Sequence, residues 1–223
     1  MGAHVAFDIG NVLCQFDIML FVRKLAEIAD ISDHDAYFFL DHLQRMQDIG
    51  VTSVAHGLEY KYKFSGEELN ILLDTWNKTL SPNEMMLKFL DNLRSDGVKI
   101  ALLSNMGPEH IAYLRSTCPQ MFEGAIQHIS CEVGARKPQK LFFQSFCLDN
   151  DEFLKSGLTL GEEGLKVDFS GCVYVDDLED NLKIGKKYGF KVYHFNLDET
   201  LKLPLSKQKI ELDKLKHIIY NKG

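Results

Sequence analysis

Residues Val173 to Asn181 read VYVDDLEDN, a short apolar run that ends in two adjacent carboxylates. A run of this kind is typical of a strand buried on both faces of a sheet. Two neighbouring carboxylates at the end of such a strand repel each other unless a cation or another positive group lies beside them. The stretch therefore predicts a buried strand that ends at a charged site formed by Asp176 and Asp177.

Four other short runs rich in Val, Ile, Phe and Tyr also predict buried strands. We expect these four strands at His4–Ile9, Val98–Ser104, Ala125–Ile129 and Phe190–Phe195. The strand described above, Gly171–Asp176, is the fifth. Helical patterns lie between the later strands, and one of them ends at Gly189, which suits the left-handed position after a helix. The alternation of strands and helices predicts an α/β fold with a Rossmann-like, doubly wound parallel sheet.

Prolines mark three expected helix starts. Ser81 and Glu84 match a capping box, with Pro82 at the first helical position. Pro108 and Pro138 are expected to open two further helices, because a proline at a helix start loses no backbone hydrogen bond.

One long stretch, residues 16–80, contains no convincing strand. Asp17 is a suitable helix cap, and Ser65 with Glu68 matches a second capping box. The apolar residues of the first helix share one face, namely Ile18, Phe21, Val22, Leu25 and Ile28. Because ligands of open α/β sheets bind at the carboxyl ends of the strands, we expect residues 16–80 to form a helical cap domain over a core domain of residues 1–15 and 81–223.

Polar side chains occur at four points that such a sheet should bring together. Asp8 ends the first strand, Ser104 and Asn105 close the second, and Lys137 lies in the segment GARKP. The carboxylate pair described above forms the fourth point. An aspartate at a strand end is more often a helix cap than a nucleophile, and a lone serine is usually a turn residue. Only the four points together therefore indicate a catalytic site.

In this order and spacing, the segments FDIGNV, SN, GARKP and VDDLEDN resemble the four motifs of haloacid dehalogenase superfamily hydrolases. The resemblance covers the core from His4 to Asn196, and the helical insertion corresponds in position to the type 1 cap of that superfamily. The motifs are most similar to those of the subgroup that contains glucose-1-phosphate phosphatases and other small sugar phosphatases.

The resemblance implies a magnesium-dependent phosphatase. Asp8 would be the nucleophile that forms an aspartyl-phosphate. Ser104 would donate a hydrogen bond to the phosphate, Lys137 would offset its charge, and Asn105 would join them in binding the substrate. The Mg²⁺ ligands would be Asp8, the Gly10 carbonyl, Asp176 and, directly or through water, Asp177.

One position departs from the superfamily pattern. Gly10 stands two positions after Asp8, where active phosphatases of the superfamily usually carry a second Asp as general acid and base. Either a residue outside the four motifs, for instance one from the cap, moves the proton, or turnover favours esters whose alcohol leaves readily. Sugar 1-phosphates belong to the second group, because an anomeric hydroxyl is more acidic than an ordinary alcohol.

Two other functions share these motifs. A haloacid dehalogenase has the same fold and also lacks the second acid, but it needs no metal and typically keeps one acid at the fourth motif, so the adjacent carboxylates argue against it. A phosphate-binding relative that has lost turnover is the second alternative. Substrate specificity would come from the cap, where the candidate residues are Gln44, Arg45, His56 and Tyr60.

Composition limits the class of partner. The chain has 25 Lys and Arg against 32 Asp and Glu, a net charge of −7, and no long basic run, so nucleic acid and anionic membranes are not expected partners. We expect a small phosphorylated substrate and a monomer or weak homodimer. The sequence shows no leader peptide and no apolar stretch of membrane-spanning length, and its five cysteines form no CxxC pair, which favours a soluble protein of the reducing cytoplasm.

Overall fold

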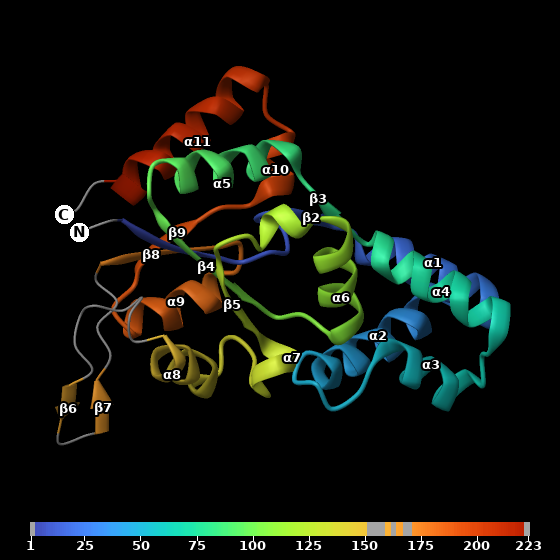
Figure 1. Ribbon diagram of the computed structural model, residues 1–223. Helices are drawn as coiled ribbons and strands as arrows, with labels where there is room; N and C mark the ends of the chain where they lie inside the picture. The colour runs from blue at the N-terminus through green and yellow to red at the C-terminus, as the bar shows by residue number, and fades with distance from the viewer. Residues whose placement is uncertain (1–2, 151–158, 162–163, 167–170, 221–223) are drawn as a thin grey trace.

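The computed structural model describes residues 3–150, 159–161, 164–166 and 171–220. Its centre is a five-stranded parallel sheet with the strand order β5-β4-β1-β8-β9 (Figure 1). The strands are β1 His4–Phe7, β4 Lys99–Ser104, β5 Ile126–Ile129, β8 Cys172–Asp176 and β9 Lys191–His194. Each lies within the range expected from the sequence, so the predicted α/β fold with a doubly wound parallel sheet is confirmed.

Helices cover both faces of this sheet (Figure 1). One face carries α5 Glu84–Ser95, α6 Pro108–Thr117 and α11 Leu205–Tyr220, and the other carries α8 Lys140–Asp149 and α9 Glu179–Lys187. The helix start expected at Pro108 is confirmed. Successive side chains of a strand point to opposite faces, so each strand contributes to two apolar cores.

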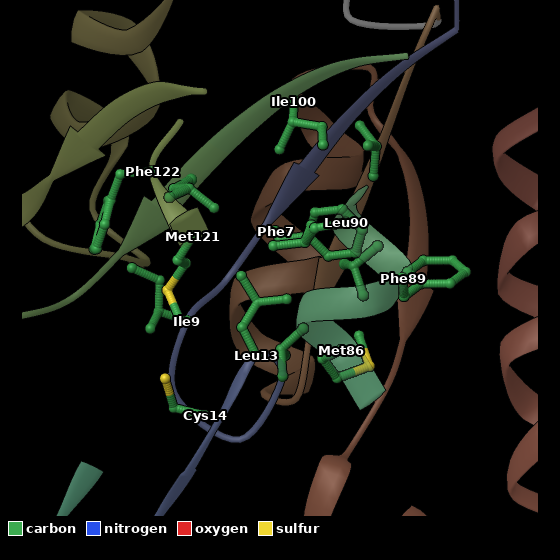
Figure 2. Close-up of a cluster of buried hydrophobic side chains, with 14 of the residues drawn as sticks. Phe7, Ile9, Leu13, Cys14, Met86, Phe89, Leu90, Ile100, Met121 and Phe122 are labelled. Carbon is green, nitrogen blue, oxygen red and sulfur yellow. The ribbon is translucent and has the colours of Figure 1, made fainter. Parts of the chain in front are cut away.

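The central strands show this division clearly. Val5 and Phe7 lie in the core under α5, α6 and α11, where Phe7 packs edge-on against Phe89 with ring centroids 6.5 Å apart (Figure 2). Ala6 and Tyr174 lie in the core under α8 and α9. Because the strands are buried on both faces, a register shift would expose or misplace apolar side chains, and the strand ends are held at fixed positions.

Four further elements belong to the part of the chain outside the insertion. They are η1 Pro119–Met121, α7 Ser130–Val133, α10 Leu197–Leu201 and a hairpin of β6 Thr159–Gly161 and β7 Gly164–Lys166. The amphipathic helix expected near the C-terminus is α11, whose Leu215 and Ile219 are buried in the core. All five cysteines are free. Within the described part of the chain, none of the helices combines the length and apolarity needed to cross a bilayer.

Four helices form the insertion and lie together at one end of the molecule (Figure 1). They are α1 Ile18–Ala29, α2 Asp33–Gln47, α3 Val54–Tyr62 and α4 Gly66–Lys78. Their apolar faces share a third core that includes Phe21 and Trp76. Asp17 caps α1 as expected, but Ser65 makes no side-chain capping bond to α4. The all-helical insertion of the predicted fold is thus present, while its status as a separate domain stays a prediction.

A short antiparallel ladder connects this insertion to the core, and the sequence did not predict it. Its strands are β2 Cys14–Phe16 and β3 Leu80–Pro82. The expected helix start at Ser81 was wrong, because pairing with β2 holds Ser81 and Pro82 extended. Asn83 instead caps α5 by accepting hydrogen bonds from the amides of Met85 and Met86 at 3.0 and 3.2 Å.

The close approach of α9 to β8 generates a prediction about stability. A Cβ added at Gly185 in α9 would lie 2.7 Å from Cδ1 of the buried Tyr174 ring. We expect Gly185→Ala to lower the free energy of unfolding by about 1–2 kcal/mol, since overpacking outweighs the gain in helix propensity. Urea unfolding measures this. Gly171→Ala, whose added Cβ meets no atom within 4 Å, is the control and should change stability by less than about 0.5 kcal/mol. Equal stability of the two variants would contradict the close contact between Gly185 and the Tyr174 ring.

Candidate active site

Three neighbouring strands end in the residues that the sequence singled out. Asp8 directly follows β1, Ser104 is the last residue of β4, and Asp176 is the last residue of β8. These strands are adjacent, and the chain order along the sheet reverses on the two sides of β1. Ligands of doubly wound sheets bind at such a reversal, beyond the carboxyl ends of the strands. The expected convergence of these three residues is therefore present.

Lys137 joins the ends of β1 and β8. Its Nζ lies 3.0 Å from Oδ1 of Asp8 and 2.7 Å from Oδ2 of Asp176. The lysine side chain is only 1% exposed. A buried ammonium is stable only when paired, so the two carboxylates and the lysine depend on one another.

Asn105 holds the backbone of Lys137 in place. Its Nδ2 donates to the Lys137 carbonyl at 2.9 Å, and the Lys137 amide donates to its Oδ1 at 2.7 Å. Both polar atoms of Asn105 therefore contact Lys137, which makes Asn105 a positioning residue; its expected contact with substrate stays a prediction. The expected helix start at Pro138 was wrong, since these bonds hold Lys137 in a loop and α8 begins at Lys140.

The two adjacent carboxylates have different surroundings. Asp176 is fully buried and accepts hydrogen bonds from the Tyr174 hydroxyl, the Leu178 amide and Asn181, besides its bond to Lys137. Asp177 lines an open cavity and accepts one bond from Asn11 at 3.2 Å. Asp177 is thus the member of the pair that a ligand in the cavity can reach, while Asn181 holds Asp176 in place.

Surplus negative charge makes this site suitable for a cation. Asp8, Asp176 and Asp177 each offer an oxygen, and these atoms lie within 4.8 Å of one another. Burial raises the pKa of Asp8 to about 7, an effect that Lys137 opposes and the two other aspartates reinforce. Burial likewise raises the pKa of Asp177. Three hard oxygen donors against one ammonium fit the preference of Mg²⁺, although their metal roles stay predictions.

A cavity of about 320 Å³ opens onto these residues. Asp8, Gly10, Ser104 and Asp177 line it from the core, together with Asn105 and Lys137. The helical insertion closes its other side through Gln44, Gln47 and Asp48. A Cβ at Gly10 would meet no atom within 4 Å, so there is free space where superfamily phosphatases usually carry their second acid.

The candidate residues in the cap separate into two groups. Gln44 lines the cavity, and Arg45 lines an adjoining pocket with Arg136 and Lys137. His56 and Tyr60 instead line a different pocket of the cap that contains none of the core residues. The placement expected for these two residues was therefore wrong, because they lie on α3 while the cavity is closed by the end of α2.

Sequence reasoning missed Gln47 and Asp48. They follow Gln44 by three and four positions, a spacing that places all three side chains on one face of a helix. Gln47 is 1% exposed and Asp48 is 6% exposed, which is unusual for polar residues. The helical spacing from Gln44 was the signal in the sequence that could have found them.

Comparison with solved structures shows what this fold resembles. A haloacid dehalogenase family enzyme from Bacteroides thetaiotaomicron, in complex with magnesium and inorganic phosphate, matches with 20% identity and a TM-score of 0.68 over 87% of this chain and 94% of its own. A phosphatase of that family from Thermococcus onnurineus matches with 22% identity and a TM-score of 0.57, over 88% and 86% of the two chains. The L-2-haloacid dehalogenase of Xanthobacter autotrophicus matches with 17% identity and a TM-score of 0.53, over 96% and 83%.

At these identities the likeness shows a shared fold. The chain has the fold of haloacid dehalogenase family enzymes, some of which were solved with magnesium or phosphate. No protein-family model and no curated protein sequence matches it.

The raised pKa of Asp8 generates a prediction about stability. The pKa of this group rises from 3.8 to about 7 on folding, so ionising it as the pH rises through that window lowers the stability of the folded state. Asp8→Asn removes this charge without changing size. We expect the free energy of unfolding of the variant, relative to wild type, to increase from pH 4 towards about pH 7 and then level off. Urea unfolding in the presence of a chelator measures the free energy of unfolding of both proteins. A difference between them that does not change with pH would contradict the raised pKa of Asp8.

Proposed function

We propose that this protein is a magnesium-dependent phosphatase of the haloacid dehalogenase superfamily that hydrolyses a small phosphate monoester. The observation that carries the proposal is the carboxylate of Asp8, held 3.0 Å from the Lys137 ammonium and beside two further carboxylates at the edge of an open cavity. The motifs of the sequence and the fold of the solved relatives support the same function.

In the first step, an oxygen of Asp8 attacks the phosphorus atom of the ester. A bond forms between that oxygen and phosphorus, the bond from phosphorus to the ester oxygen breaks, and the departing alcohol takes up a proton. Lys137 offsets charge at Asp8, and the Ser104 hydroxyl, at the end of β4, is suited to donate to a phosphoryl oxygen. The product of this step is a phosphorylated Asp8.

In the second step, water attacks the same phosphorus atom. The bond between phosphorus and Asp8 breaks, inorganic phosphate is released, and the carboxylate is restored. The closed side of the cavity, formed by α2, limits how much solvent surrounds the ester during the first step.

Asp8, the Gly10 carbonyl and Asp177 are the groups we expect to hold Mg²⁺, because all three line the cavity. Asp176, which the sequence predicted as a further ligand, already accepts several hydrogen bonds, so in this proposal it supports the site through its ion pair with Lys137. When bound, the ion would offset the negative charge that prevents a carboxylate from approaching a phosphate.

The volume of the cavity and the similarity of the four motifs to those of small sugar phosphatases favour a sugar phosphate as substrate. A space of about 320 Å³ suits a small ester and leaves little room for a macromolecule. A dehalogenase shares the fold but needs no metal, and Lys137, which already pairs with Asp8 and Asp176, would then be left to offset the charge of Asp177 as well.

Asp8→Asn is expected to abolish turnover. The change removes the nucleophile at constant size, and loss of a nucleophile normally lowers kcat by several orders of magnitude. Steady-state hydrolysis of p-nitrophenyl phosphate measures kcat, and circular dichroism verifies that the variant is folded. Retention of about a tenth of the wild-type activity would refute a covalent mechanism through Asp8.

Removal of the metal is expected to stop the reaction reversibly. EDTA should eliminate phosphate release and Mg²⁺ should restore it, and Asp177→Asn should raise the Mg²⁺ concentration for half-maximal activity by about tenfold or more. Phosphate release against Mg²⁺ concentration gives this value, with Asp180→Asn on the exposed face of α9 as the control. Full hydrolysis in the chelator, or release of halide from a 2-haloacid, would contradict the proposed function.

A further inference from the structure

We propose that Asp48, on the helical insertion, is the general acid and base that moves protons to and from the reacting oxygens in place of the acid absent at position 10. This inference rests on the proposed function and adds a catalytic residue to it. It would divide the chemistry between the nucleophile in the core and the proton donor in the cap.

Asp48 brings a carboxyl group from the helical insertion to the cavity that Asp8 lines from the core. Asp48 directly follows α2, and its side chain, 9% exposed, lines the same cavity as Asp8 and Gly10. Its Oδ2 lies 3.4 Å from Nη1 of Arg136, the residue before Lys137. The carboxyl group is therefore both enclosed and directed to the segment that carries the catalytic lysine.

Elimination among the cavity residues leaves Asp48 as the proton carrier. The described residues that line the cavity include six ionisable side chains, those of Asp8, Asp48, His110, Arg136, Lys137 and Asp177. Asp8 is the nucleophile and Asp177 a metal ligand in the proposed function. Lys137 is ion-paired on both sides, and an arginine does not release its proton.

His110 is also unsuitable as the donor. Its Nε2 lies 2.8 Å from the carbonyl of Trp76 and 3.1 Å from the Thr79 hydroxyl. Burial lowers the pKa of His110 to about 4, so the ring is neutral at physiological pH and its one N–H is already bonded. Its contacts join α4 to α6, which is a structural role.

The surroundings of Asp48 suit alternating protonation. Burial raises its pKa to about 6, an effect that Arg136 and Lys137 oppose. The C-terminal end of α2, whose partial charge is negative, also disfavours the carboxylate. The nearby Cys131 thiol stays neutral, because burial raises its pKa to about 11. A group whose pKa lies close to physiological pH is an efficient donor and acceptor of protons.

Contacts between the insertion and the core keep this carboxyl group in place. Gln47 packs against Gly107 so closely that a Cβ there would lie 2.4 Å from its Oε1. The Glu109 carboxylate at the start of α6 accepts a hydrogen bond from the Ala55 amide at 3.1 Å. These contacts hold the chain to the core both before Asp48, at Gln47, and after it, at Ala55.

The proton balance closes over one turnover. In the first step the Asp48 carboxyl donates its proton to the ester oxygen as the bond from phosphorus to that oxygen breaks. In the second step the Asp48 carboxylate accepts a proton from the water that attacks phosphorus. Asp48 ends protonated, as it began, and the ester has been converted to an alcohol and phosphate.

The test is a series of phosphate esters whose leaving groups differ in pKa, measured as kcat/KM for wild type and Asp48→Asn in saturating Mg²⁺. We expect a shallow dependence on leaving-group pKa in wild type. Asp48→Asn should lose about a hundredfold or more with alkyl phosphates and far less with p-nitrophenyl phosphate, whose leaving group needs no proton, so its plot should be steep. Because Asp and Asn have the same size, we expect the variant to fold, and its activity with p-nitrophenyl phosphate verifies this.

Three further variants separate catalysis from structure. Gly10→Asp in the Asp48→Asn background uses the free space at position 10 and should recover alkyl phosphate hydrolysis by about tenfold or more. Arg136→Met breaks the ion pair but leaves the carboxyl group, so its plot should stay shallow. Asp74→Asn, which breaks the exposed pair with Lys78 in the same insertion, should behave as wild type.

Two outcomes would overturn the inference, and they differ from a failure of the proposed function. An unchanged slope in Asp48→Asn, with wild type active, would show that Asp48 moves no proton. Equal steepening in Arg136→Met would show that Asp48 acts only as a partner of Arg136. Absence of Mg²⁺-dependent hydrolysis of every ester by wild type would instead refute the phosphatase function itself, and this inference with it.

Discussion

The ammonium of Lys137, buried between Asp8 and Asp176, is the interaction on which the site depends. It joins the ends of two strands that are adjacent in the sheet and far apart in the sequence. Three carboxylates lie at that edge beside one lysine, and the pKa of Asp8 is raised chiefly by burial, an effect that Lys137 opposes and the two other aspartates reinforce. The fold thus holds the Asp8 carboxyl group in surroundings that disfavour its charge and that a bound cation would relieve, at the expense of stability when no cation is bound.

Asn105 illustrates how the core prepares this interaction. Its amide group engages both the N–H and the carbonyl of Lys137, so the loop that carries the lysine is positioned by a residue from the end of the neighbouring strand. Tyr174 and Asn181 hold the side chain of Asp176 by donating hydrogen bonds to its carboxylate. The parallel sheet therefore fixes the site twice, through the strand ends themselves and through the hydrogen bonds around the charged side chains.

The sequence predicted the strands and the convergence of Asp8, Ser104 and Asp176, because buried parallel strands carry a continuous apolar signal and their carboxyl ends meet at one edge. It did not predict the β2–β3 ladder, since three-residue strands leave almost no pattern. Nor did it place Asp48 at the cavity, which depends on how the end of α2 packs onto the core. The helical spacing from Gln44 was a signal in the sequence, but the packing itself is a tertiary contact between distant segments.

The covalent role of Asp8 is the central claim, and trapping its phosphorylated form tests it most directly. Wild-type protein would be mixed with p-nitrophenyl phosphate and Mg²⁺, quenched in acid during the burst of nitrophenolate release, digested and analysed by mass spectrometry. If Asp8 is the nucleophile, the peptide that contains it gains one phosphoryl group, and the same peptide from Asp8→Asn gains none. A burst that leaves this peptide unmodified, or that places the phosphoryl group on another residue, would contradict this role of Asp8.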